Sequence, residues 1–314
     1  MSSASGAQII AIDWGTSSLR AALMSPDGAV LERIASPDGI MFANGRSFEA
    51  IFRDLFSGWL ARYPRAGVLA SGMIGSRQGW VEAPYVACPA GFDDLARALI
   101  FVDIPGLTRI GFVPGLSIEH ADGVPDVIRG EETQVFGALA VLGLTEGIFV
   151  LPGTHSKWVT VKDSRITGFR TFLTGEMFDV LRRHSILGRL MTDTEPAGER
   201  GGKAFDLGCK LSAGGRLLHH LFSVRSRGLL GKTAPADLSD YMSGLLIGEE
   251  IREAKALMWA GTELQIYLVG RGDLAGLYRQ ALASYDIEAT ALDDSVTFAG
   301  LFALARTHRA QIEA

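Results

Sequence analysis

The chain has few of the features that mark secreted, zinc-binding or nucleic-acid-binding proteins. Only Cys88 and Cys209 are present among 314 residues. Two cysteines are too few for a disulfide framework, and their separation fits no zinc-binding pattern. The net charge of −5 gives no electrostatic reason to expect a nucleic acid or an anionic membrane surface as a partner. These features favour an intracellular protein with reduced cysteines.

Targeting signals and long apolar segments are also lacking. The first residues, MSSASGAQ, have neither the basic start nor the apolar core of a signal peptide. The apolar run at 135–144 has about half the length that a bilayer span requires. No GxxxxGK[ST] loop occurs, which excludes a P-loop enzyme. We therefore expect a cytoplasmic protein without membrane association, and base rates for oligomers favour a homodimer.

Two segments share one layout. Residues 9–24, IIAIDWGTSSLRAALM, and residues 148–161, IFVLPGTHSKWVTV, each run an apolar strand through a Gly-Thr turn into a second strand. When Gly15 is aligned with Gly153, the following Thr and Ser residues also coincide, but Asp13 falls opposite Leu151. Two such turns facing each other across a cleft would bind a polyphosphate through backbone N–H groups and hydroxyls, with the one carboxylate left for a metal ion.

The apolar spacing predicts similar elements around both turns. In the first half, three strands are followed by a helix with apolar residues at helical intervals over 48–60 and by a buried strand over 66–74. The second half begins with the same strand order, and helices are expected over 131–142, 238–258 and 274–283. This is an α/β pattern of two domains, each a mixed sheet flanked by helices. We place the boundary near Gly143, which gives domains of residues 1–143 and 144–314.

The turns define the expected nucleotide site. Asp13 is predicted to hold Mg²⁺ through water, as this ion keeps much of its hydration shell, although Asp-x-Gly-Thr also occurs as an ordinary strand-ending turn. The residues expected to bind ATP are Gly15, Thr16 and Ser17 in the first turn, Gly153, Thr154, His155, Ser156 and Lys157 in the second, and Gly270 and Gly272 on the adenosine side. A local hydrogen bond for His155, a solvated strand position for Lys157 and an ordinary helix start after Gly270 are the competing interpretations.

A second group of residues is expected to bind and activate the phosphoryl acceptor. Glu131 and Glu132 follow a glycine at a predicted helix start and are candidates for a general base, while helix dipoles favour acids at that position in any case. In the Gly- and Pro-rich segment 71–91, Arg77 is suited to grip a carboxylate in a bidentate fork, unless it forms a surface salt bridge. Gln78 and Trp80 belong to the same candidate site. Glu176 either binds sugar hydroxyls or caps its helix.

Five blocks together carry a resemblance to a known family. They are DWGT at 13–16, GMIGSRQGWVEAPY at 72–85, RGEETQ at 129–134, LPGTHSKWV at 151–159 and FLTGEMFDVLRRHSIL at 172–187. With them the chain resembles the 2-dehydro-3-deoxygalactonokinase family, over about residues 9–305. The resemblance implies two actin-like (ribonuclease H-like) domains with an ATP cleft between them. It also implies transfer of a phosphoryl group from MgATP to the C6 hydroxyl of 2-dehydro-3-deoxy-D-galactonate, in galactonate or galactose breakdown.

The resemblance leaves two questions open. Related sugar kinases have an aspartate base at a helix start, in a motif like GDQQ, whereas this chain has Gly130 followed by two glutamates. Glu131 is the first candidate for the base, Glu132 the second and Asp126 the third. Two rival functions share the fold: an ATP-binding regulator related to actin, and an ATPase or phosphatase that needs no sugar acceptor.

Overall fold

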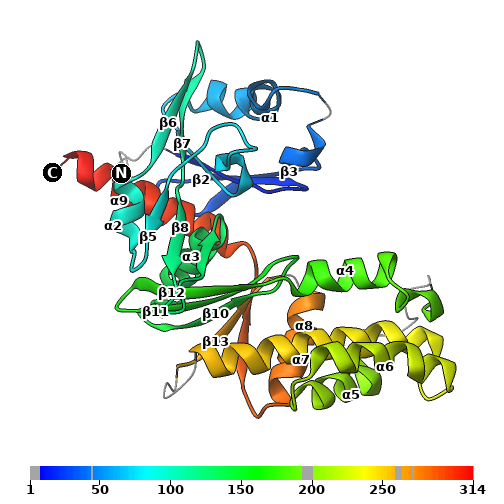
Figure 1. Cartoon of the computed structure of the whole chain (residues 1–314). Coiled ribbons are helices and arrows are strands. Elements are labelled where there is room, and N and C mark those ends of the chain that lie inside the picture. Colours follow the sequence, from blue (N-terminus) through cyan, green and yellow to red (C-terminus); the bar gives the residue numbers. More distant parts are fainter. Residues whose placement is uncertain (1–7, 44, 193–200, 259–263, 271, 314) are drawn as a thin grey trace. The chain divides into compact units, whose positions relative to one another are not determined.

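The computed structural model describes residues 8–43, 45–192, 201–258, 264–270 and 272–313 (Figure 1). The chain forms two compact units. Unit 1 consists of residues 1–146, 161–168 and 294–314, and unit 2 of residues 147–160 and 169–293.

Unit 1 is built on a six-stranded sheet with the order β3-β2-β1-β4-β7-β6. The strands β1, β2 and β3 form an antiparallel meander, whereas β4 pairs in parallel with both β1 and β7. The bounds of the strands are β1 Ile9–Trp14, β2 Leu19–Met24, β3 Val30–Ser36, β4 Gly67–Ser71, β6 Ile100–Ile104 and β7 Thr108–Phe112. Because β1 is covered on both faces, its first four residues are all buried.

Helix α1, Phe48–Arg62, covers this sheet as its apolar spacing predicts. Ser47 caps the helix by accepting a hydrogen bond from the Ala50 N–H, and Ile51, Phe52 and Phe56 are fully buried against the sheet. The expected strand over 66–74 is shorter in the structure, where β4 ends at Ser71 and the short 3₁₀ helix η2, Met73–Gly75, follows. The other short elements here are η1 Ile40–Phe42 and α2 Phe92–Arg97.

A small sheet and two packed helices complete unit 1. The sheet has the order β5-β8-β9, with bounds Tyr85–Ala87, Gly115–Glu119 and Pro125–Ile128. Helix α3, Glu131–Leu142, packs against the closing helix α9, Val296–Glu313. Their backbones nearly touch: a Cβ on Gly137 would lie 1.8 Å from the Val296 carbonyl oxygen, and one on Gly300 would lie 2.1 Å from that of Thr133.

This helix pair explains one difference from the expected domain division. The expected boundary at Gly143 is close to the end of the first segment of unit 1 at residue 146. However, α9 belongs to unit 1 although it closes the chain, because its glycine contact with α3 holds it there. The contact joins residues that are far apart in the sequence, and no local pattern indicates it.

Unit 2 repeats the sheet topology of unit 1. The sheet that unit 2 mainly builds has the order β12-β11-β10-β13-β14, with β10, β13 and β14 parallel, and only residues 161–168 of β11 and β12 are counted with unit 1. The strand bounds are β10 Gly147–Leu151, β11 Ser156–Lys162, β12 Arg165–Phe172, β13 Ile266–Val269 and β14 Ala289–Leu292. The repeat therefore extends from the turn motif seen in the sequence to a whole five-strand order, which confirms the predicted pair of mixed sheets flanked by helices.

The other regular elements described in unit 2 are helices. Helix α7, Leu238–Met258, packs against α5, Gly202–Ser212, and α6, Leu217–Leu229 (Figure 1). The remaining elements are α4 Thr174–His184, η3 Gly188–Leu190, η4 Pro235–Asp237 and α8 Gly272–Ala283. The predicted bounds of α7 are correct. Among all the helices described, none is both long enough and apolar enough to cross a lipid bilayer.

Candidate active site

The first Gly-Thr turn joins β1 to β2 and presents its tip to solvent. The Gly15 N–H donates to the Ser18 carbonyl oxygen at 2.9 Å, and Thr16 and Ser17 are exposed. Gly39 packs against the back of the turn, where a Cβ would lie 2.3 Å from the Ser17 carbonyl carbon. The turn is thus supported from behind, which leaves the exposed side available for phosphate oxygens.

Asp13 is the second-to-last residue of β1, next to this turn, and forms part of a charged cluster. It pairs in register with Arg20 on β2, and the Arg20 Nη2 donates to the Asp13 Oδ2 at 2.6 Å. The Nη1 of the same guanidinium donates to Asp294. Burial raises the pKa of Asp13, while the charge of Arg20 and its hydrogen bond act in the opposite direction. The Arg20 guanidinium therefore bridges the carboxylates of Asp13 and Asp294 at the position predicted to hold the metal ion.

Two glycines bring the start of α3 close to Asp13. Gly72 has a φ of 95°, and a Cβ on it would lie 2.8 Å from the Trp14 carbonyl oxygen and 3.5 Å from the Asp13 Oδ1. Gly130, the N-cap of α3, has a φ of 105°, and a Cβ on it would lie 3.1 Å from the Gly72 Cα. A side chain at either position would force these segments apart and would also strain the backbone. Glu131 is close enough that its charge raises the pKa of Asp13.

The two candidate bases have different surroundings. Glu132 is fully buried; its Oε2 accepts from the Gly130 N–H at 2.7 Å, and its Oε1 accepts from the Thr133 hydroxyl at 3.1 Å. Burial, with the nearby charge of Glu131 as a second cause, raises the pKa of Glu132 to about 7. Glu131 is half-buried, and its Oε2 accepts from the Arg129 N–H at 2.9 Å. Of the two side chains, Glu131 is the one that a substrate reaches without opening the core.

The Gly- and Pro-rich segment after β4 divides its residues between core and surface. Arg77 and Gln78 are exposed. The Trp80 ring instead packs edge to face against Trp14, with centroids 6.3 Å apart, and also against Phe52 and Phe112. Trp80 therefore anchors this segment to the core of unit 1, a role that its position among polar residues does not indicate.

The second Gly-Thr turn, in unit 2, is tied to α4. Gly175 of α4 packs so closely that a Cβ there would lie 2.4 Å from the Gly153 carbonyl oxygen. The Glu176 N–H donates to the Thr154 carbonyl oxygen at 2.9 Å, and the Glu176 carboxylate bonds the His155 Nε2. The His155 side chain therefore bonds to Glu176 on α4, 21 residues along the chain, rather than within its own turn. Thr154 and His155 are exposed at the tip of the turn.

Ser156 and Lys157 lie below the tip rather than on it. The Ser156 hydroxyl is fully buried and donates to the Glu250 Oε1 at 2.7 Å. Lys157 is 5 % exposed, and its Nζ donates to the His155 carbonyl oxygen at 2.9 Å. Lys157 is therefore not a solvated strand residue. Both side chains hold the turn in shape, and the exposed positions before them face the solvent.

A cavity of about 110 Å³ adjoins the second turn within unit 2. Its lining residues come from the turn, α4, α7 and α8, namely Gly153, Thr174, Gly175, Phe178, Ser243, Leu246, Ile247, Leu274 and Tyr278. Gly270, at the end of β13, is a neighbour of the turn, because a Cβ there would lie 3.8 Å from the Pro152 Cδ. Gly272 begins α8. The lining is mostly apolar, and the cavity lies directly beside the glycine turn.

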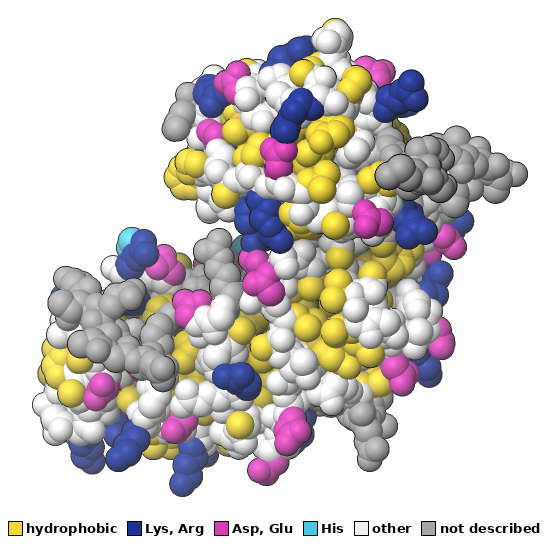
Figure 2. All heavy atoms as spheres, turned by 180° about the vertical axis from the view of Figure 1, so that it is seen from behind, with side chains coloured by type: hydrophobic (Ala, Val, Ile, Leu, Met, Phe, Trp, Pro, Cys, Tyr) yellow, Lys and Arg dark blue, Asp and Glu magenta, His cyan; other side chains and the backbone are white. Residues whose placement is uncertain are grey.

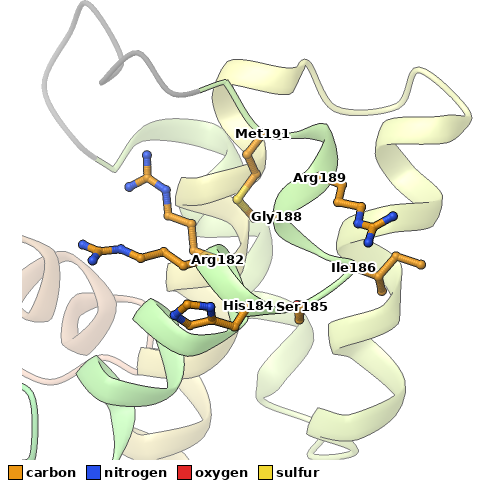
Figure 3. A pocket seen from close by; sticks show the side chains of 8 residues that line it. Arg182, His184, Ser185, Ile186, Gly188, Arg189 and Met191 are labelled. Carbon is orange, nitrogen blue, oxygen red and sulfur yellow. The ribbon is translucent and has the colours of Figure 1, made fainter.

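A second cavity in unit 2, of about 780 Å³, is lined by none of the predicted site residues (Figure 3). Its lining residues are Arg182, Arg183, His184, Ser185, Ile186, Gly188, Arg189 and Met191. The Arg182, Arg183 and His184 side chains lie in the last turn of α4, where the helix dipole stabilises cations without a ligand. These charges therefore do not by themselves indicate a bound ligand.

Groups of metal-binding side chains and the distribution of surface charge were also compared with the predicted ligands. Within the described ranges, no group of three or more His, Cys, Asp or Glu side chains is arranged to hold a metal ion. On the described part of the face in Figure 2, basic and acidic side chains are interspersed without a continuous basic surface.

The duplicated sheets and their glycine turns define the class of protein: an actin-like fold of the kind found in sugar kinases. The activator of 2-hydroxyisocaproyl-CoA dehydratase from Clostridium difficile has this fold at 12% identity, with a TM-score of 0.52 over 98% of both chains. The family to which the chain belongs is a narrower group than this fold class. The 2-keto-3-deoxy-galactonokinase family model matches residues 13–304, and the chain belongs to that family.

Individual relatives agree with the family match. The chain is 41% identical to a "probable 2-dehydro-3-deoxygalactonokinase" of Rhizobium meliloti, over 94% of this chain and 96% of the relative. It is 34% identical to 2-dehydro-3-deoxygalactonokinase of Escherichia coli, over 95% and 98%. A solved structure from Sinorhizobium meliloti, of a protein named for the same activity, has a TM-score of 0.84 at 40% identity and covers 95% of this chain and 98% of that one.

Three residues of the site region were not singled out from the sequence. Arg20 and Asp294 complete the cluster at Asp13, and Glu250 lies beneath the second turn. The acidic pair directly after β14 was the available signal for Asp294, since strand ends carry functional side chains in α/β sheets. Glu250 had no signal, because it lies among the charged residues of a long helix.

Proposed function

We propose that this protein is a kinase that transfers the γ-phosphoryl group of MgATP to the C6 hydroxyl of 2-dehydro-3-deoxy-D-galactonate. The observation that carries the proposal is the convergence of Asp13, Arg20, Asp294 and the start of α3 in a chain that belongs to the 2-keto-3-deoxy-galactonokinase family. Phosphoryl transfer needs positioning and charge neutralisation more than covalent chemistry, and this cluster offers both. The cytoplasm, which supplies ATP, is the proposed site of action.

The phosphates are assigned to the two Gly-Thr turns. Thr16 and Ser17 in the first turn and Thr154 in the second are exposed and offer hydroxyls and backbone N–H groups. The adenosine is assigned to the cavity beside Gly153, with Gly270 and Gly272 at its edge. The carboxylates Asp13 and Asp294 would hold Mg²⁺, which neutralises phosphate charge when bound. Arg20 then bonds both carboxylates and orients them.

Glu131 is the proposed general base. Its carboxylate is held at one oxygen by the Arg129 N–H and is half-buried at the start of α3. In this role the Glu131 carboxylate accepts the proton of the C6 hydroxyl as the hydroxyl oxygen attacks the γ-phosphorus atom and ADP leaves. Glu132 has a structural role, because its buried carboxylate bonds the Gly130 N–H and shapes the helix start.

The sugar acid is assigned to the segment that follows β4. Arg77 is exposed there, and its guanidinium offers a bidentate pair of donors for the substrate carboxylate. Gln78 is exposed beside it and offers a neutral donor and acceptor for a hydroxyl or the keto oxygen. Trp80 supports both indirectly by holding the segment on the core.

The test is ADP release measured with and without the acceptor. A kinase of this specificity should release ADP only when 2-dehydro-3-deoxygalactonate is present, and 2-dehydro-3-deoxygluconate serves as the epimeric comparison. ADP release at the same rate without either acid would identify an ATPase and refute the proposal. Nucleotide binding without turnover under any of these conditions would identify the regulator and refute it as well.

A further inference from the structure

One buried carboxylate connects three elements of the nucleotide side of unit 2. Glu250 lies on α7 and is 3 % exposed. Its Oε1 accepts from the Ser156 hydroxyl and from the Trp158 Nε1–H, both at 2.7 Å. Its Oε2 accepts from the Tyr278 hydroxyl, also at 2.7 Å, and Thr174 provides a further side-chain hydrogen bond. The donors come from β11, α8 and the first residue of α4.

These donors coincide with the surroundings of the predicted nucleotide. Ser156 follows directly after the second Gly-Thr turn, and both Thr174 and Tyr278 line the cavity of about 110 Å³ beside that turn. Gly175, next to Thr174, packs against the backbone of the same turn. The carboxylate therefore lies behind the wall of the cavity and determines the positions of the groups that form it.

A carboxylate suits this position better than any other side chain. Two oxygens provide about four lone-pair sites, which matches the donors present, whereas an amide offers one oxygen and would turn two N–H donors toward donors. Burial raises the pKa of Glu250, and the hydrogen bonds from Ser156, Thr174, Tyr278 and Trp158 act against that rise. A buried carboxylate with this desolvation cost destabilises the fold unless well-placed hydrogen bonds compensate for the lost water.

We propose that Glu250 is a positioning residue for the nucleotide, one that fixes the second Gly-Thr turn, α4 and α8 in the arrangement that binds ATP. This inference rests on the proposed function only in taking the second turn and its cavity as the ATP side of the site. It assigns no contact between Glu250 and ATP. The effect passes through Ser156, Thr174 and Tyr278.

The experiment uses two near-isosteric variants and a matched control. E250Q preserves volume and removes half of the acceptor capacity, while Y278F removes the hydroxyl that donates to Oε2 and that also bonds Ser156 and Thr174. Y285F is the control, because the Tyr285 hydroxyl also bonds α7, at the Gly248 carbonyl oxygen at 2.9 Å, but Tyr285 does not line the cavity. The measurements are KM for ATP, KM for the sugar acid, the Kd of a non-hydrolysable ATP analogue and the thermal midpoint.

We expect Y278F and E250Q to raise both KM for ATP and the analogue Kd by about tenfold, the effect of losing one charge-assisted hydrogen bond. KM for the sugar acid should change less than about twofold, and Y285F should leave all binding constants near their original values. If E250Q does not fold, Y278F alone decides the outcome.

Two results would overturn the inference. One is an unchanged analogue Kd in a folded Y278F or E250Q protein. The other is an equal loss for both substrates that Y285F reproduces at the same thermal midpoint, which would show a merely structural role. Failure of the proposed function appears elsewhere, as ADP release by the unaltered protein that does not depend on the sugar acid. The Kd of the analogue tests the role of Glu250 in either case.

Discussion

Replacing Glu132 with glutamine should change how the stability of the protein depends on pH. Glu132 is fully buried, and its pKa is about 7 in the folded chain against an ordinary value of 4.5. The folded state therefore binds a proton more tightly than the unfolded state does. Below pH 4.5 Glu132 is protonated in both the folded and the unfolded state, and its carboxyl does not lower the stability of the fold. As the pH rises from 4.5 to 7, stability falls, and above 7 the loss is complete.

The size of the effect follows from these two values. At 1.36 kcal/mol per pH unit, the full difference corresponds to about 3 kcal/mol, of which about 2.5 kcal/mol develops between pH 5 and pH 8.5. E132Q cannot ionise, and its amide oxygen still accepts from the Gly130 N–H. The unfolding free energy of E132Q, relative to the unaltered protein, should therefore rise by about 2.5 kcal/mol over this range.

Urea unfolding followed by tryptophan fluorescence at several pH values measures this difference directly. Other titrating groups cancel, because both proteins contain them. E49Q is the control, because Glu49 also lies in the first turn of a helix but its side chain is 45% exposed. The unfolding free energy of E49Q, plotted against pH, should run parallel to that of the unaltered protein. Parallel curves for E132Q would refute the account of Glu132 as a buried, hard-to-ionise structural group. Loss of turnover in E132Q as large as in E131Q would refute the choice of Glu131 as base.

Three further variants test the assigned roles by steady-state kinetics. D13N should lower turnover by at least ~10²-fold with the fold intact, which is the scale expected for a main electrostatic group. The control D27N, in the neighbouring hairpin turn, should not lower turnover. Near-normal turnover of D13N would contradict a role of Asp13 in holding the metal ion. E131Q should lower kcat more than it weakens binding of either substrate, and a loss confined to KM would contradict a base. R77A should raise KM for the sugar acid by about tenfold and leave KM for ATP nearly unchanged, with R109A as the surface control; equal changes in both constants would argue against carboxylate binding by Arg77.

The sequence was most informative where structure is determined locally. The apolar strands that run into the turns at Gly15 and Gly153 and out of them indicated both strand pairs, and the apolar spacing over 48–60 indicated α1. The apolar residues Leu245, Leu246, Ile251 and Leu257 accompanied the correct prediction of the bounds of α7. In each case the physical signal lies within a few residues of its effect, so a single sequence contains it.

The rest depended on contacts between distant residues. The return of α9 to unit 1 depends on Gly137 and Gly300, whose missing side chains allow two helix backbones to meet. The sequence places Trp80 among polar neighbours, yet its ring packs against the core of unit 1. Glu131 and Glu132 are adjacent and alike in the sequence, and only the direction of each side chain from α3 separates the half-buried carboxylate from the fully buried one.

The central claim is that this protein attaches phosphate to the C6 oxygen of its sugar acid. The most direct measurement is a phosphorus–proton correlation NMR spectrum of the mixture formed from ATP and 2-dehydro-3-deoxygalactonate. We predict one new phosphomonoester signal that couples to the two C6 protons, in an amount equal to the ADP formed. Inorganic phosphate as the sole new signal, or an ester coupled to another carbon, would contradict the account.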